Sequence, residues 1–158
     1  MAENDAVITT PRTYLRKIRP DDRPFIERLD WLDIDRVYRR TMKMYEEQGY
    51  GLWAVVLAET GDFAGLCGLL DQQVESRYEL EVGYHLLHEY RGRGLATEVA
   101  RAAMEYAFQT LGKSSLISLI LPDNAASTGV AGKNGLVLER DAVFRGLDVS
   151  VFAIHNDR

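Results

Sequence analysis

A six-residue run in the middle of the chain, Arg91 to Ala96, has residues suited to binding phosphate: Arg-Gly-Arg-Gly-Leu-Ala. It follows a strand-like segment, Tyr78 to Leu87, and opens an amphipathic segment, Leu95 to Leu111, that is typical of a helix. Where a strand passes through a glycine turn into a helix, unpaired backbone N–H groups meet the positive end of the helix dipole. The two arginines add positive charge. The run therefore predicts a turn that binds phosphate or pyrophosphate.

Four interpretations of this turn compete. A dinucleotide-binding fingerprint needs a third glycine, and that position holds Thr97. A P-loop needs the full sequence Gly-x-x-x-x-Gly-Lys-Ser/Thr; Gly112-Lys113-Ser114 is present, but position 107, where the first glycine belongs, is alanine. The pyrophosphate turn of acyl-CoA-dependent N-acetyltransferases has the pattern Gln/Arg-x-x-Gly-x-Gly/Ala, which Arg91-x-x-Gly94-x-Ala96 matches in full. A plain glycine turn with solvated arginines is the fourth, so the sequence around the turn has to decide.

Composition and charge limit the class of protein. The chain has 158 residues, 46% of them hydrophobic and 27% charged, as is usual for a globular domain. A net charge of −5 argues against nucleic-acid binding. A single cysteine, Cys67, fits a reducing cytoplasm, and neither a signal peptide nor a membrane span is expected.

Metal chemistry finds little support in the sequence. The three histidines are His85, His88 and His155, and neither paired cysteines nor an HExxH spacing accompanies them. We therefore expect no metal site.

The hydrophobic pattern predicts one domain in which strands and helices alternate. The order expected is one strand, two helices, three strands, a helix, a strand, a helix and two strands. The expected strands are Thr13–Arg19, Leu52–Ala58, Phe63–Leu70, Tyr78–Leu87, Leu116–Leu121, Leu136–Phe144 and Leu147–Ile154, and the expected helices are Asp22–Leu29, Ile34–Gln48, Leu95–Leu111 and Ala125–Asn134.

Together with the turn, four further motifs carry a resemblance to a known family: Glu81 to Tyr84, Pro122 to Ser127, Lys133-x-Gly135 and Phe144 to Gly146. On these motifs the chain resembles the GCN5-related N-acetyltransferase (GNAT) superfamily over essentially its whole length. The closer likeness is to the RimJ/RimL-like branch, named for ribosomal-protein N-terminal acetyltransferases. The resemblance implies a single domain, 1–158, with a mixed α/β fold. Its sheet would be twisted and mostly antiparallel, with about seven strands, splayed middle strands and about four flanking helices.

The chain departs from this family at the helix after Asn124. Gly129 and Gly132 stand where relatives have better helix formers, and each costs about 1 kcal/mol relative to alanine. Asn134 and Leu136 replace positions that are commonly leucine and an aromatic residue. We therefore expect a shorter or softer helix here.

The resemblance also implies a site for acetyl-CoA. The pantetheine arm would fill the gap beside the splayed strand, where a backbone N–H near Leu86 or Leu87 would stabilise the oxyanion. Ser127 matches the serine suggested as the general acid, with helix capping as its alternative role. The residues expected to bind the cofactor are Leu86, Leu87, Arg91, Gly92, Arg93, Gly94, Leu95, Ala96, Thr97, Asn124 and Lys133.

Acetyl transfer to an amine needs a free lone pair. A lysine-like amine with a pKa of about 10.4 is almost fully protonated at neutral pH, so a carboxylate base assists it. Glu81, on the polar face of its strand, is the candidate base, and Glu79 is its substitute. Both could instead be solvated glutamates.

The expected partners are acetyl-CoA and an amine acceptor, either a peptide N-terminus or a small molecule, bound by a monomer or homodimer. Asp30, Trp31, Asp33 and Asp35 would make the acceptor's entrance attractive to a cation, although helix capping and solvation explain the same aspartates. A non-catalytic acyl-CoA sensor is the alternative function, and a nucleotide-binding regulator is a third.

Overall fold

The strands of this protein form one eight-stranded sheet in a computed structural model that describes residues 5–29 and 33–156. The strands are β1 (Ala6–Thr9), β2 (Thr13–Lys17), β3 (Leu52–Leu57), β4 (Phe63–Val74), β5 (Arg77–Leu86), β6 (Ser115–Ile120), β7 (Val137–Phe144) and β8 (Leu147–His155). Their order in the sheet is β1-β2-β3-β4-β5-β6-β8-β7. Every neighbouring pair is antiparallel except β5 and β6, which are parallel.

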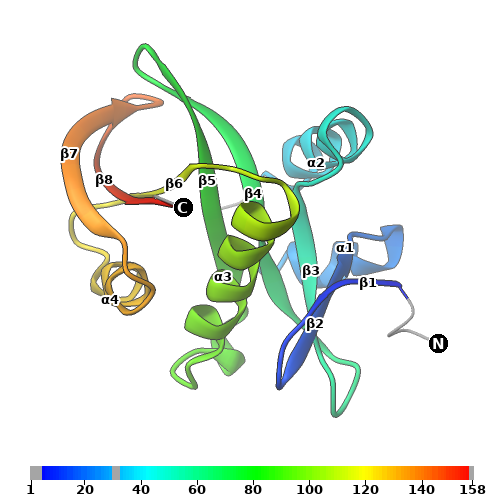
Figure 1. The fold of residues 1–158 in the computed structure, drawn as a ribbon. Helices are drawn as coiled ribbons and strands as arrows, with labels where there is room; N and C mark the ends of the chain where they lie inside the picture. The colour runs from blue at the N-terminus through cyan, green and yellow to red at the C-terminus, as the bar shows by residue number, and fades with distance from the viewer. Residues whose placement is uncertain (1–4, 30–32, 157–158) are drawn as a thin grey trace.

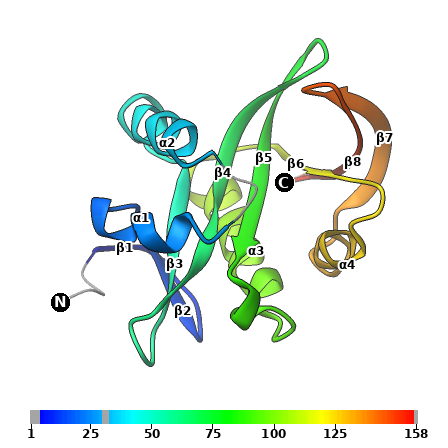
Figure 2. The ribbon, with the colours of Figure 1, turned by 180° about the vertical axis from the view of Figure 1, so that it is seen from behind.

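Helices cover both faces of the sheet, as Figures 1 and 2 show. They are α1 (Arg23–Ile26), α2 (Ile34–Gln48), α3 (Leu95–Glu105) and α4 (Ala125–Lys133). Helices α1 and α2 bury apolar side chains against one face of β3 and β4, and α3 buries Val99 and Ala103 against the other. Helix α4 lies near the end of the sheet formed by β7 and β8 (Figure 1). The sheet and its two helical layers therefore hold the glycine turn at one end of β5.

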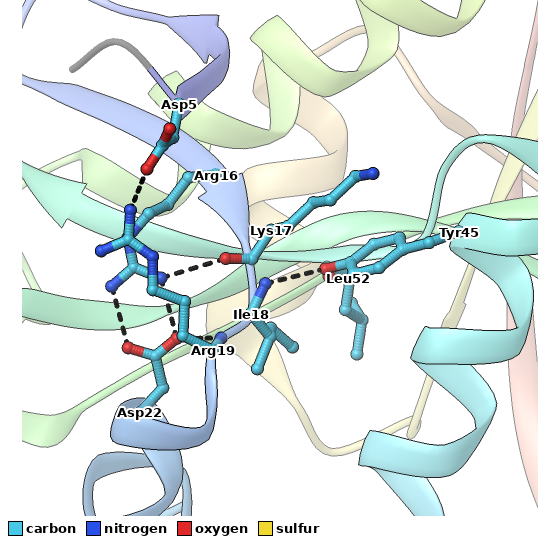
Figure 3. Close-up of polar contacts among 8 residues, drawn as sticks. All are labelled: Asp5, Arg16, Lys17, Ile18, Arg19, Asp22, Tyr45 and Leu52. Carbon is cyan, nitrogen blue, oxygen red and sulfur yellow. Dashed lines mark hydrogen bonds and ion pairs between the residues drawn. The ribbon is translucent and has the colours of Figure 1, made fainter. Parts of the chain in front are cut away.

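Two buried polar contacts fix α1 and α2 on their face of the sheet (Figure 3). Asp22, just before α1, accepts two hydrogen bonds of 2.8 Å from Arg16 of β2. Tyr45 of α2 accepts from the backbone N–H of Ile18 at 3.1 Å and donates to the carbonyl of Leu52. Because both pairs lie close to the apolar core, the position of α2 relative to the sheet is well determined.

The sheet is nearly divided between β5 and β6. The ladder that joins these strands has a single pair of residues, Glu81 and Ile117, in the described part of the chain. Just past this pair, the buried hydroxyl of Ser118 donates to the carbonyl of Val82 at 2.9 Å. Beyond Val82 the two strands diverge, which agrees with the splayed middle strands expected from the sequence.

The mostly antiparallel α/β sheet with four helices, counted over the described residues, confirms the predicted fold class. The strand count is eight rather than about seven, because no strand was predicted before Thr13 and β1 forms there by pairing with β2. The expected helix Asp22–Leu29 is a 3-10 turn, Pro20–Asp22, followed by the single turn α1, which ends at Ile26. Helix α3 continues to Thr110 as a wider π-helical turn.

Candidate functional site

The glycine turn leads directly from the end of β5 into α3. Gly92 and Gly94 both lie in the left-handed region, with φ of +76° and +77°. Gly94 is the N-cap of α3, so no capping side chain can accept from the first amides, and the first intrahelical bond runs from Glu98 to the Gly94 carbonyl. The N–H groups of residues 95–97 therefore have no intrahelical partner, which leaves a site for anionic oxygens.

A tether from the β1–β2 connection holds this turn in place. Arg12 donates to the carbonyl of Arg93 at 2.9 Å and to the carboxylate of Glu98 at 2.8 Å. Thr10 donates to the same carboxylate at 2.7 Å. Burial by itself would raise the pKa of Glu98, but these hydrogen bonds outweigh it and lower the pKa. Glu98 thus stays ionised and fixes the first turn of α3 to the sheet.

The two arginines of the turn have different positions. Arg91 donates from Nε to the carbonyl of Leu86 at 3.0 Å, which locks the turn against the end of β5. The guanidinium of Arg93 lies 5.8 Å from the ring centroid of Tyr90, in a cation–π contact. Both side chains remain exposed, so their charges can reach a ligand at the turn.

The register of β4 and β5 decides which backbone groups face the gap beside β6. Leu86 lies opposite Gly65, and the N–H of Leu87 donates to the carbonyl of Ala64 at 2.9 Å. In an antiparallel ladder this bond makes Leu86 and Gly65 a non-hydrogen-bonded pair, so the N–H of Leu86 points away from β4. The N–H of Leu87 is used within the sheet, which favours Leu86 over Leu87 as the oxyanion donor. Leu86 stays a prediction.

Glu81 lies where β5 and β6 meet, and both of its carboxylate oxygens accept hydrogen bonds. One accepts from the backbone N–H of Leu119 and the other from the buried amide of Gln72, each at 2.9 Å. Burial raises the pKa of Glu81, although these hydrogen bonds and the nearby Arg40 and Arg145 oppose the rise. The side chain is therefore a buried carboxylate with raised basicity, as a general base requires, and not a solvated strand glutamate.

Glu79, the substitute base, has a different environment. Its carboxylate pairs with Arg140 of β7 at 2.9 Å. Glu81 is thus the stronger candidate of the two.

Tyr84 and Ser127 come together although 43 positions separate them. The Tyr84 hydroxyl donates to the carbonyl of Ser127 at 3.1 Å. Burial raises the pKa of Tyr84 to about 12, while hydrogen bonding to Ser127 opposes the rise. Ser127 also donates its N–H to Asn124 at 3.1 Å, so Asn124 is the cap of α4 and Ser127 is not.

The end of α4 is braced against the first turn of α3. Arg101 donates to Asn134 at 3.0 Å and to the carbonyl of Lys133 at 3.1 Å. Asn134 in turn donates to the carbonyl of Thr97 at 3.2 Å. These contacts hold α4 beside the glycine turn despite its two glycines, and place exposed Lys133 in the same neighbourhood.

The aspartates expected at the acceptor's entrance have structural roles where the structure describes them. Asp33 caps α2 by accepting from the N–H of Arg36 at 3.2 Å. Asp35 pairs with Arg23 at 3.0 Å. Asp30 and Trp31 lie outside the described residues.

Other sites offer no alternative centre. A cavity of about 550 Å³ lies beside the distal ends of β4 and β5, lined by residues such as Gln73, Tyr78 and Lys113 and by none of the glycine turn.

Over residues 5–29 and 33–156, no group of three histidine, cysteine or acidic side chains is placed to hold a metal. Burial and Arg91 lower the pKa of His85 to about 4. None of the helices in these ranges could span a membrane.

Sequence reasoning missed Arg12, Gln72 and Tyr84. Arg12 reaches the turn from the β1–β2 connection and Gln72 reaches Glu81 from the neighbouring strand β4, so nothing in the local pattern marks them. Tyr84 could have been found from the sequence, because it lies on the same strand as Glu81, close to the glycine turn.

Residues 12–137 match the family model described as acetyltransferase (GNAT) domain. A Bacillus subtilis protein, the uncharacterized protein YkkB, is 40% identical over 92 residues, which are 57% of this chain and 54% of YkkB. Two more curated relatives are matched over 56% and 60% of their length, so the chain spans little more than half of these relatives.

Solved structures agree over nearly the whole chain. An acetyltransferase from Agrobacterium tumefaciens superposes with a TM-score of 0.81 at 26% identity, covering 94% of each chain. A putative ribosomal-protein-serine acetyltransferase from Vibrio cholerae gives 0.75 at 20% identity, covering 94% of this chain and 97% of that one.

Proposed function

Because the chain belongs to the GNAT acetyltransferase family, we propose that it is an acetyl-CoA-dependent enzyme that transfers an acetyl group to a primary amine. The reaction proposed is direct attack of the amine on the thioester in a ternary complex. One observation carries the proposal: the uncapped start of α3, with its glycines at positive φ, lies at the mouth of the gap between β5 and β6.

The residues of the turn fit the diphosphate of acetyl-CoA. The free N–H groups of residues 95–97 would bind its oxygens, and Arg91, Arg93 and Lys133 would add charge. Gly92 and Gly94 carry no Cβ, so the backbone can approach the phosphates closely. The pantetheine arm would then lie beside β5, where the backbone groups of Tyr84 and Leu86 face the gap and Asn124 lies nearby.

The transfer itself needs a base, a donor to the oxyanion and a source of a proton for the leaving thiolate. The amine nitrogen attacks the thioester carbonyl carbon and gives up a proton, for which Glu81 is the proposed base. The N–H of Leu86 is the proposed donor to the oxyanion of the tetrahedral intermediate. When the C–S bond breaks, the thiolate leaves and takes a proton. Because a thiol has a pKa of about 8.5, this last proton matters least.

Tyr84 and Ser127 are the proposed sources of that proton, and the hydrogen bond from the Tyr84 hydroxyl to the backbone carbonyl of Ser127 puts the two residues side by side. We expect Tyr84→Phe to lower kcat about 10-fold and Ser127→Ala to lower it less, because the thiolate is already a good leaving group. The measurement is kcat for both variants with saturating acetyl-CoA.

Thr128→Ala is the matched control, since Thr128 is exposed on the next position of α4 and its hydroxyl bonds only within the helix. If Tyr84→Phe and Ser127→Ala keep the kcat of this control, neither residue supplies the proton.

The acceptor is proposed to be a protein N-terminus or a small amine, in line with the RimJ/RimL-like branch. The motifs Pro122 to Ser127 and Lys133-x-Gly135 support this branch, and a fold like that of the Vibrio cholerae ribosomal-protein-serine acetyltransferase agrees with it.

The test of the function is release of free thiol from acetyl-CoA over a panel of N-terminal peptides, amino acids, polyamines and aminoglycosides. We expect amine-dependent release with at least one class, together with thermal stabilisation by CoA. Stabilisation by CoA without release on any acceptor would identify a sensor instead. Stabilisation by ATP or NAD and not by CoA would identify a nucleotide-binding regulator.

A further inference from the structure

Three arginines from two distant parts of the chain gather beside Glu81. Arg36 and Arg40 lie one helical turn apart on α2, so they share a face of that helix. Arg145 lies in the turn between β7 and β8. In Figure 2, α2 and the β7–β8 turn flank the distal halves of β4 and β5 from opposite sides. The β7–β8 hairpin is tied to β5 and the β4–β5 turn by Arg140, which pairs with Glu79 at 2.9 Å, and by the N–H of Val143, which donates to Glu75 at 3.2 Å.

Arg40 connects this cluster directly to the base. It donates to the side-chain oxygen of Gln72 at 3.1 Å and to the backbone carbonyl of Asp71. Gln72 then donates to Glu81 at 2.9 Å. Both acceptors of Arg40 are neutral, so the guanidinium keeps its full charge.

The cluster has no counter-ion of its own. None of its three arginines forms an ion pair with an acidic side chain that the structure describes. The carboxylates in the area are committed elsewhere: Asp35 to Arg23 at 3.0 Å, Glu79 to Arg140 at 2.9 Å, and Glu75 to the N–H of Val143 at 3.2 Å. Two negative groups, Glu81 and Asp71, remain beside the three arginines, and Asp71 accepts from the hydroxyl of Tyr50 at 2.6 Å.

The electrostatics of the three arginines agree with this placement. Burial lowers the pKa of Arg40 and of Arg145, and in both cases Arg36 lowers it further, while Glu81 opposes the change. The protein as a whole carries a net charge of −5, so this excess of positive charge is local. Like charges held together without a counter-ion are typical of a site that binds an anion.

The backbone at Arg145 gives a second, independent reason. Arg145 and Gly146 have φ of +52° and +78°, the conformation of a type I′ hairpin turn. The first of these positions favours asparagine, aspartate or glycine, and an arginine there is conformationally unfavourable. The guanidinium lies 4.9 Å from the ring of Phe144, which directs the side chain along the hairpin. Stability of the turn does not explain this residue.

We propose that Arg36, Arg40 and Arg145 bind the carboxylate or phosphate group of an acceptor whose amine lies beside Glu81. The substrate class is therefore an amine that carries an oxyanion, such as an amino acid, an acidic peptide or an amino phosphate. This inference rests on the proposed acetyl transfer, and it is the opposite of the cation-attracting entrance expected from the sequence.

Matched acceptors test the substrate class. Tyrosine and tyramine differ by a carboxylate, and phosphoethanolamine and ethanolamine differ by a phosphate, so the two pairs also separate the two kinds of oxyanion. After correction for the fraction of free amine, we expect kcat/KM to be about 10- to 100-fold higher for the anionic member of at least one pair. Equal or better turnover of both neutral members would overturn the inference while leaving acetyl transfer intact.

Variants of two of these arginines test whether they cause the preference for anionic acceptors. Arg145→Asn removes the charge and suits the turn better, and Arg36→Gln removes a charge that is exposed on α2. We expect each to lower kcat/KM for the anionic acceptor about 10-fold with little change for the neutral one. Arg39→Gln, exposed on another face of α2, is the control and should change neither. An anion preference that survives both variants would show that the anion binds elsewhere.

Binding of inorganic phosphate, followed by thermal unfolding, tests the site without turnover. Phosphate should stabilise the wild-type protein more than the combined variant Arg36→Gln/Arg145→Asn, and the part that survives in the variant belongs to the glycine turn. Equal stabilisation of both proteins would overturn the anion site. If no acceptor releases thiol, the proposed function fails, and this measurement still decides the site.

Discussion

Replacing Glu81 by glutamine is expected to lower kcat by about 10² to 10⁴, with the KM for acetyl-CoA nearly unchanged. The substitution keeps the shape of the side chain but removes its basicity. The turn at Arg91 to Ala96 is not touched, so the cofactor should bind as before. The measurement is steady-state kinetics with the best acceptor of the panel, with thermal unfolding as a check on the fold.

The control separates basicity from geometry. Glu81 accepts from Gln72 and from the N–H of Leu119, so Glu81→Gln also disturbs one hydrogen bond. Gln72→Ala removes that same bond and leaves the carboxylate. If Gln72→Ala loses as much kcat as Glu81→Gln, the role of Glu81 is to hold β5 to β6. A Glu81→Gln enzyme within a few-fold of wild type would place the base elsewhere.

The dependence of the rate on pH also separates a base at Glu81 from a purely structural role. Because burial raises the pKa of Glu81, the wild-type rate should fall on the acid side at a higher pH than an ordinary glutamate would give. Protonated Glu81 cannot accept the proton of the amine, so the rate is lost as the pH decreases through this raised pKa. In Glu81→Gln that acid limb should disappear, and the deficit should shrink as the pH approaches the pKa of the acceptor.

Gly94→Val is expected to raise the KM for acetyl-CoA at least about 10-fold while the protein stays folded. Gly94 has a φ of +77°, which a β-branched residue adopts only with strain, and its backbone borders the free amides of α3. A Cβ at this position would meet only the guanidinium of Arg12, at 3.6 Å, so the fold has room for it. The loss should therefore appear in cofactor binding, measured as KM and as stabilisation by CoA.

Gly61→Val is the matched control for strain. Gly61 has a φ of +78° in the β3–β4 hairpin, and a Cβ added there would have no neighbouring atom within 4 Å among the described residues. Gly61 also lies outside the site. Both variants should lose similar stability, but only Gly94→Val should lose affinity for acetyl-CoA. An unchanged KM in folded Gly94→Val would remove the basis for placing the diphosphate at this turn.

Local patterns predicted most of the fold. Helix α2 begins and ends as expected, because Asp33 caps its start and Gly49 takes the left-handed conformation at its end. The register of hydrophobic side chains likewise predicted β3 and β5 to within a residue. Strand β1, which forms a hairpin with β2, was not predicted from the sequence, and a helix was expected as far as Leu29, whereas α1 ends at Ile26.

The sequence likewise predicted only part of the candidate site. The turn at Arg91 to Ala96 is local, so its residue types predict both its position and its conformation. Leu86 could not be told from Leu87, because the choice depends on which of the two N–H groups β4 occupies. The arginine cluster was equally hidden, since Arg40 and Arg145 are more than one hundred positions apart in sequence and meet only in the folded chain.

The single ladder pair between β5 and β6 also bears on how the protein unfolds. Backbone hydrogen bonds normally make a sheet one cooperative unit, yet here β1 to β5 and β6 to β8 share almost none in the described chain. The halves are coupled mainly through side chains, and Glu81, Ser118 and the Glu79–Arg140 ion pair are among the polar ones. A molecule that hydrogen-bonds along β5 would supply the missing coupling. The same contact would then both bind the substrate and make the two halves of the sheet unfold together.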